Sequence, residues 1–236
     1  MPRCCRPARH CKKPPNKRAG SMRIGLIHAV QVAIDPINQA FARQWPEAEC
    51  MNVLDDRLSV DRAKSAELTD AVGARILSLA QYARAGGADA VLFTCSAFGP
   101  AIAAAGQALD VPVLTPNEAM FEAALGYGER IAMLVSFEPS VASLRQEFED
   151  LLEEHGVAAT LEVICVPDAM TALRAGDGAR HDALLAGAAG DLAACGAIML
   201  GQFSTARAKD AVAAATGKPV LTSPDTAVEA LKRQLG

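Results

Sequence analysis

Two short segments of the chain carry polar groups suited to proton chemistry. Cys95 follows the apolar run in VLFTCSA (91–97), and Gln202 follows the apolar run in IMLGQFS (198–204). A cysteine between a buried strand and a helix faces the helix dipole and free backbone N–H groups, which lower a thiol pKa from about 8.5. The sequence therefore predicts a thiolate at Cys95 that acts as acid, base or nucleophile, with a buried structural cysteine as the alternative.

The surroundings of Cys95 and Gln202 indicate an internal duplication. Pro112 follows Cys95 at the same spacing at which Pro219 follows Gln202, and each proline opens a Pro-Val-Leu-Thr sequence. Ligands of parallel α/β sheets bind beyond the carboxyl ends of the strands, so the duplication places Cys95 and Gln202 on opposite walls of one cleft. A glutamine cannot exchange a proton at neutral pH, so Gln202 is expected to be a hydrogen-bond donor at the site.

Polar residues at the other predicted strand ends are candidate substrate contacts. His28 ends the first strand and is interpreted either as a ligand-side group or as a satisfied core group. Asn117 and Glu118 follow a later strand and either contact substrate or cap the next helix, where Thr115 with Glu118 fits a capping box. The remaining candidates would supply hydroxyl or N–H donors to a carboxylate, although most Ser and Thr at such turns cap helices: Ser96, Ala97, Ser136, Phe203 and Ser204.

The elements that must position these residues alternate along the chain. The predicted strands are 23–29, 49–54, 89–94, 111–115, 130–136, 160–166, 197–201 and 219–222. Helices are expected over 36–45, 61–85, 97–109, 139–155, 169–195 with a break near 176–178, 204–216 and 224–235. This alternation predicts an α/β fold of two pseudo-symmetric, Rossmann-like parallel-sheet halves with the active site in the cleft between them. The expected halves are 22–116 with 224–236, and 117–223.

Residues 1–21 differ in composition from the remainder. They hold seven of the 23 Lys and Arg and none of the 27 acids, so the chain from Met22 carries 16 basic and 27 acidic residues, a net charge of −11. We interpret this segment as a disordered basic leader without the apolar region of a secretory signal. The alternatives are a true start at Met22, a basic targeting arm, and a metal-binding or redox-sensing role for its cysteines, Cys4, Cys5 and Cys11.

Composition also restricts compartment and partners. The other cysteines are scattered and form no CxxC pair, which favours reduced thiols in the cytoplasm. The whole-chain net charge of −4 gives no indication of nucleic-acid binding, and no apolar run is long enough for a membrane helix. The expected partner is a small carboxylate substrate, and a homodimer is the default for such folds. No metal-ligand cluster, phosphate loop or suitably placed Schiff-base lysine is apparent, so neither cofactor nor metal is expected.

At these residues the chain resembles the aspartate/glutamate racemase superfamily, which includes glutamate, aspartate and hydantoin racemases, maleate isomerase and arylmalonate decarboxylase. The resemblance covers about Met22 to Gly236 and depends on the opening strand RIGLIHA, on FTCSA around Cys95, and on LGQFS around Gln202. It implies a two-domain fold that acts on a small carboxylate without a cofactor. Two-cysteine members use one thiolate and one thiol on opposite faces of the carbon, and here Gln202 replaces the second cysteine.

The resemblance implies a cofactor-independent racemase or isomerase that acts at the carbon next to the carboxylate of a small amino acid or related acid. Cys95 would be the acid/base, and Gln202 would assist it. The alternatives are a decarboxylase of a malonate-type acid and a non-catalytic protein that binds small acids.

Overall fold

The computed structural model describes residues 21–65, 67–190, 192 and 194–236. Except for Ser21, the expected leader and its three cysteines lie outside these residues. No helix in the described ranges is both long and apolar enough to cross a membrane.

Eight strands form two separate four-stranded sheets. The first sheet contains β1 (Arg23–His28), β2 (Glu49–Leu54), β3 (Ala90–Phe93) and β4 (Val113–Leu114), in the order β2-β1-β3-β4. The second contains β5 (Arg130–Val135), β6 (Thr160–Cys165), β7 (Ala197–Leu200) and β8 (Val220–Thr222), in the order β6-β5-β7-β8. Every pairing is parallel, so the carboxyl ends of the strands lie at one edge of each sheet. The expected fold class is confirmed.

Ten α-helices and four 3₁₀ turns connect the strands in the described ranges. The helices are α1 (Ile34–Gln44), α2 (Leu58–Arg62), α3 (Asp70–Ala85), α4 (Gly99–Ala108), α5 (Glu118–Leu125), α6 (Val141–His155), α7 (Pro167–Arg174), α8 (Gly178–Ala188), α9 (Lys209–Thr216) and α10 (Ser223–Leu235). The 3₁₀ turns are η1 (Gln31–Ala33), η2 (Ser96–Phe98), η3 (Glu138–Ser140) and η4 (Phe203–Ala208). Four predicted helices lie within two residues of α1, α4, α6 and α10. The segment expected to be helical to 195 ends at Ala188, the helix expected from 204 begins as η4, and α5 was not among the predicted helices.

The two halves repeat with a constant spacing. The first residues of β1 and β5 are separated by the same number of positions as those of η1 and η3, of α1 and α6, and of β3 and β7. Cys95 and Gln202 have the same separation, and each is the residue before a 3₁₀ turn. The structure thus supports the duplication inferred from the Pro-Val-Leu-Thr sequences.

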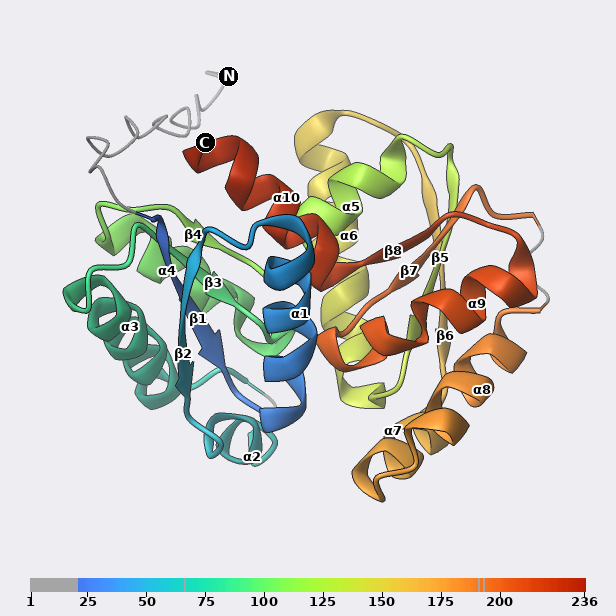
Figure 1. Ribbon diagram of the computed structural model, residues 1–236, viewed down its shortest axis with the longest axis horizontal. Helices are drawn as coiled ribbons and strands as arrows, with labels where there is room; N and C mark the ends of the chain where they lie inside the picture. The colour runs from blue at the N-terminus through green and yellow to red at the C-terminus, as the bar shows by residue number, and fades with distance from the viewer. Residues whose placement is uncertain (1–20, 66, 191, 193) are drawn as a thin grey trace, which may run out of the picture.

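The halves exchange helices across their interface. Val228 and Leu231 of α10 pack with Ile24 of the first sheet, although α10 follows the last strand of the second. In the same way, Met120 and Phe121 of α5 belong to the core of the second sheet. Figure 1 shows the two sheets in separate lobes with α1, α5, α6 and α10 between them. These four helices fix how the two carboxyl edges are positioned relative to each other.

The prediction of one long helix over 61–85 was wrong. The segment instead forms α2 and α3, and the second begins where the Thr69 side chain accepts a hydrogen bond from the N–H of Val72. The apolar spacing continues on both sides of this N-cap, so a prediction from periodicity alone did not detect the helix boundary at Thr69. The helix ends predicted at glycine residues agree with the structure. Gly87 adopts a φ of +88° just after α3, and Gly156 adopts a φ of +64° after α6.

Candidate active site

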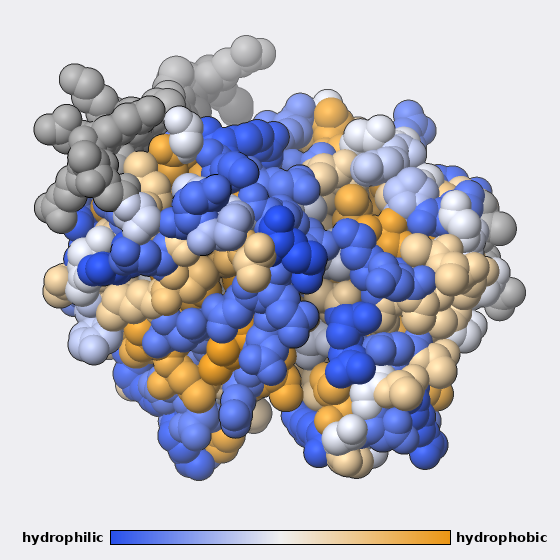
Figure 2. All heavy atoms as spheres, in the orientation of Figure 1, coloured by the Kyte–Doolittle hydropathy of each residue, from blue (hydrophilic) through white to orange (hydrophobic). Residues whose placement is uncertain are grey.

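The site is built around the turns that follow the central strands β3 and β7. The η2 turn after Cys95 packs against α6 of the second half, and η4 after Gln202 packs against η1 and α1 of the first half. Each turn therefore contacts the opposite half. Figure 2 shows a notch in the molecular outline between the lobe with α2 and the lobe with α7, on the side toward which β1 and β5 run in Figure 1.

Cys95 is partly exposed and packs against the core of the first half. Its backbone is extended, at φ −137° and ψ 125°, so the chain bends only at Ser96. Burial raises the pKa of the Cys95 thiol, the N–H of Ala97 bound to the sulfur lowers it, and the negative charge of Glu147 raises it again. The expected stabilised thiolate is therefore wrong for this structure: the N–H group is present, but burial and a neighbouring acid outweigh it.

Glu147 on α6 is the acid that acts on Cys95, and the sequence reasoning missed it. Its Oε2 accepts a hydrogen bond from Asn117 Nδ2 at 3.4 Å. Burial raises the pKa of Glu147 to about 7, the Asn117 hydrogen bond lowers it, and nearby Asp150 and Glu118 add to the increase. The available signal was its position three residues after Leu144 on the buried face of an amphipathic helix.

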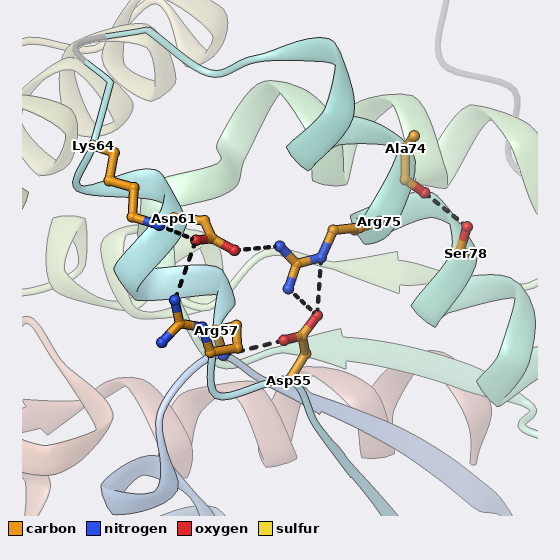
Figure 3. Close-up of polar contacts among 7 residues, drawn as sticks. All are labelled: Asp55, Arg57, Asp61, Lys64, Ala74, Arg75 and Ser78. Atoms are coloured by element: carbon orange, nitrogen blue, oxygen red, sulfur yellow. Dashed lines mark hydrogen bonds and ion pairs between the residues drawn. The ribbon is translucent and has the colours of Figure 1, made fainter.

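A polar wall from the 55–75 region borders the Cys95 turn. Arg62 at the end of α2 donates from Nε to the carbonyl of Ala97 at 3.2 Å. On α3, Arg75 lies between two acids, with Nη1 2.7 Å from Asp61 Oδ2 and Nη2 2.5 Å from Asp55 Oδ2 (Figure 3). This network fixes α2 against α3 and so supports the position of Arg62.

Gln202 is fixed by the second half. Its Oε1 accepts hydrogen bonds from the N–H of Ser136 at 2.9 Å and from Ser136 Oγ at 2.8 Å, and its Nε2 donates to Ser140 Oγ at 3.1 Å. The structure thus brings together two predicted site residues, Gln202 and Ser136. Through these hydrogen bonds the Gln202 amide stabilises the turn between β5 and α6.

The residues that follow Gln202 are largely buried or engaged in backbone hydrogen bonds. The Phe203 side chain is buried in the core of the first half, so only its backbone remains a candidate donor. Ser204 is buried at 6% exposure. The N–H of Thr205, in the segment expected to supply donors to the substrate, is taken by the carbonyl of Gln202 at 3.1 Å.

His28 lies at the end of β1 with no exposed surface. Its Nδ1 is 2.9 Å from Thr94 Oγ1 and its Nε2 is 2.9 Å from Asn52 Oδ1. Burial lowers the pKa of His28, and the Asn52 hydrogen bond opposes that change in part. Because Asn52 Nδ2 donates to Asn38 Oδ1 at 3.2 Å, Asn52 Oδ1 faces the ring, which makes His28 Nε2 the donor and Nδ1 the acceptor. Protein groups therefore satisfy both ring nitrogens.

Asn117 and Glu118 do not cap α5 with their side chains as the capping interpretation expected. Asn117 is the N-cap residue, but its side chain makes no cap hydrogen bond. Its Oδ1 instead accepts from Ser223 Oγ at 2.9 Å. Thr115 Oγ1 donates to Glu118 Oε2 at 3.3 Å, which is a contact between side chains. Asn117 thus connects the ends of β4 and β8 to Glu147.

Among the described residues, no group of three or more His, Cys, Asp or Glu side chains is arranged to hold a metal ion. The groups near the two turns include the thiol of Cys95, the buried carboxyl of Glu147 and the amide of Gln202.

Residues 28–231 match the family described as Asp/Glu/Hydantoin racemase. No curated protein matches the chain. Among solved structures, allantoin racemase from Klebsiella pneumoniae is similar at 22% identity and a TM-score of 0.70, with 90% of this chain and 87% of that chain covered. Aspartate racemase from Picrophilus torridus is 13% identical with a TM-score of 0.68, covering 91% and 94%. The Gly74Cys mutant of arylmalonate decarboxylase is 20% identical with a TM-score of 0.63, covering 91% and 93%.

These solved structures share the fold of the chain. The family match extends over most of the sequence and includes both turns, the thiol of Cys95 and the amide of Gln202. The chain therefore belongs to the Asp/Glu/hydantoin racemase family.

Proposed function

We propose that the protein is a cofactor-independent isomerase that moves a proton at the carbon next to the carboxylate of a small amino acid or related acid, with Cys95 as its acid/base. The observation that carries the proposal is the position of a half-buried cysteine at the carboxyl end of a central parallel strand, directly before η2. Ligands of such sheets bind at this edge.

The proposed chemistry separates binding from proton transfer. Backbone N–H groups of Ser96, Phe203 and Ser204 bind the substrate carboxylate and stabilise the enediolate-like charge that develops when the α-proton leaves. Cys95 Sγ exchanges that proton. Because burial keeps the resting group a thiol, it must lose its proton before it can act as a base.

Gln202 contributes hydrogen bonding to the proposed site. Ser136 occupies its Oε1 and Ser140 binds one of its two Nε2–H donors, and the amide cannot supply a proton to the second face of the carbon. Free Cys50, Cys95, Cys165 and Cys195 support the expected reducing, cytoplasmic setting.

A second candidate function is decarboxylation of a malonate-type acid. The raised pKa of Cys95 favours it, because loss of carbon dioxide generates the carbanion without a base and requires one acid to protonate it. In that reaction Sγ–H gives its proton to the carbanion, and the resulting thiolate regains a proton from water.

The test is proton exchange in heavy water. The wild-type protein is incubated with a panel of amino, hydroxy and malonic acids, and deuterium at the α-carbon and loss of carbon dioxide are followed by mass spectrometry. We expect exchange for at least one amino or hydroxy acid, its loss in Cys95→Ala, and its retention in Cys50→Ala, which removes a thiol on β2. Binding without exchange or decarboxylation would instead indicate a small-acid-binding protein, and full turnover by Cys95→Ala would refute the role of the thiol.

A further inference from the structure

Glu147 is an acidic residue on the buried face of α6, where a solvated side chain would not be expected. The buried residues of α6 are Leu144, Phe148 and Leu151, and Glu147 lies within the same stripe. Phe148 is anchored by an edge-to-face contact with Phe121 of α5, with ring centroids 5.5 Å apart. This packing holds Glu147 at the interface between the halves.

The Glu147 carboxyl faces the Cys95 turn. Its Oε2 is bonded to Asn117 Nδ2, and a Cβ at Gly99, four residues after Cys95, would lie 3.9 Å from its Oε1. The α6 helix packs against η2, which joins these two positions. The carboxyl therefore lies beside the turn that follows the thiol, although the two groups come from different halves.

Among the described residues, the charged groups that act on Glu147 are acids. Asp150 on α6 and Glu118 on α5 are both acids that act on Glu147. Arg62, which contacts the Cys95 turn, donates to the carbonyls of Ala97 and Ser65. Within the described part of the chain Glu147 makes no ion pair. Protonation of either Glu147 or Cys95 therefore keeps the two groups from being negatively charged at the same time.

The repeat shows that this acid belongs to the first turn alone. At the constant spacing between the halves, Ala40 of α1 is the counterpart of Glu147, as Gln202 is the counterpart of Cys95. Ala40 is buried in the core of the first half and cannot titrate. Thiol and carboxyl thus occur together at one turn, and both are replaced at the other.

We propose that Glu147 is a positioning residue that shares one exchangeable proton with Cys95 and so sets whether the sulfur acts as an acid or as a base. With Glu147 ionised, the proton is on Sγ and Cys95 is an acid. When water carries the proton from Sγ to Glu147, the S–H bond breaks, an O–H bond forms on the carboxyl and the electron pair stays on sulfur. Cys95 then becomes the base that the proposed function requires. The negative charge of the pair is the same in both forms.

The directions of the two pKa changes agree with this sharing. Burial and the neighbouring acids raise the pKa of Glu147 to about 7, and the Glu147 charge helps to raise the pKa of Cys95. Neutral Glu147 or a neutral replacement should therefore make the thiolate easier to form.

The test measures the sulfur directly and needs no substrate. Alkylation of Cys95 by iodoacetamide is followed by peptide-resolved mass spectrometry from about pH 6 to about pH 10, because only the thiolate reacts. Glu147→Gln should shift the rate profile to lower pH and increase the rate at about pH 8 by about three- to tenfold. Glu147→Asp, which keeps the charge, should stay close to wild type, and so should Glu149→Gln, which alters an exposed acid of the same helix.

A rate profile of Glu147→Gln that coincides with wild type would overturn the proposal. A second measurement covers the case in which that variant does not fold: in wild-type protein with ¹³Cβ-labelled cysteine, the Cys95 resonance should titrate with an additional inflection near pH 7 that reports Glu147. A single inflection would also overturn it. Neither result depends on turnover, so the failure of this inference is distinguishable from the failure of the proposed function.

Discussion

The turn after β3 and the turn after β7 have the same backbone plan and different chemical content. The first carries a thiol, Cys95, with a buried carboxyl from the other half beside it. The second carries an amide, Gln202, whose oxygen and nitrogen are held by two serines of its own half. The duplicated scaffold therefore keeps the strand ends in place, while the thiol and the buried carboxyl beside it occur at only one of the two turns.

The acidic residues near the two turns also differ, because only the acid near the second turn is paired with cations. Asp225, at the start of α10, is bound by Lys209 at 2.8 Å and by Arg43 at 2.8 Å. Glu147 has only the amide of Asn117 as a described hydrogen-bond partner. The carboxylate near the second turn is neutralised by fixed cations and stabilises the interface, whereas Glu147 is left to titrate.

Removal of the thiol should have the largest effect. General acid–base groups typically contribute about 10²- to 10⁴-fold to rate, so Cys95→Ser should lower turnover of the true substrate by about that factor. Cys165→Ala removes a thiol at the end of the edge strand β6 and should keep most of the activity. Steady-state kinetics with both variants distinguishes the central strand end from the edge, and equal losses would contradict that distinction.

Neutralising Glu147 should stabilise the folded protein at neutral to alkaline pH. The folded-state pKa of about 7 lies above the ordinary value of 4.5, so the folded state binds more protons and wild type loses stability as the pH rises between these values. The loss corresponds to about 3 kcal/mol at most. Urea unfolding at about pH 5 and about pH 8 should show it in wild type and not in Glu147→Gln; a wild-type stability independent of pH in this window would refute the buried charge.

Truncation of Gln202 should cost stability. Gln202→Ala leaves the N–H and hydroxyl of buried Ser136 without their acceptor, which costs about 1–3 kcal/mol. Gln202→Glu keeps an acceptor for both groups and should lose less. Unfolding midpoints of the two variants give the comparison, and an Ala variant as stable as wild type would show that water replaces the amide without penalty.

A smaller effect is expected from His28. Its folded-state pKa is below the ordinary value because of burial, so the unfolded chain takes up a proton first and stability falls as the pH drops below about 6.5. His28→Gln should show a weaker dependence in this range. The comparison is made in the Glu147→Gln background, since Glu147 changes stability in the opposite direction over an overlapping range.

The fold was largely predictable from local pattern, because buried strands of a parallel sheet read as short apolar runs. The run ending at Phe93 gave β3 to within one residue at either end, and Gly156 marked the end of α6. Prediction failed where a polar cap lies inside an apolar period, as at Thr69. The capping alternative at Asn117 also failed, because the Asn117 side chain accepts a hydrogen bond from Ser223 and makes none to its own helix.

The candidate site was predictable only in part. The sequence places Cys95, Ser136 and Gln202 at strand ends, and the structure joins the last two by hydrogen bonds. The raised pKa of Cys95 and the role of Glu147 depend on α6 of one half packing against η2 of the other. A pattern read along the chain contains no information on such a contact between distant segments.

The most direct test of a single proton-exchanging turn uses one enantiomer of the substrate in heavy water. With one thiol serving the site, we predict that the recovered starting enantiomer acquires deuterium at the α-carbon at least as fast as the opposite enantiomer forms, and that Cys95→Ala acquires none. Deuterium confined to the inverted product at early times, or exchange by Cys95→Ala at the wild-type rate, would contradict the assignment of the chemistry to Cys95.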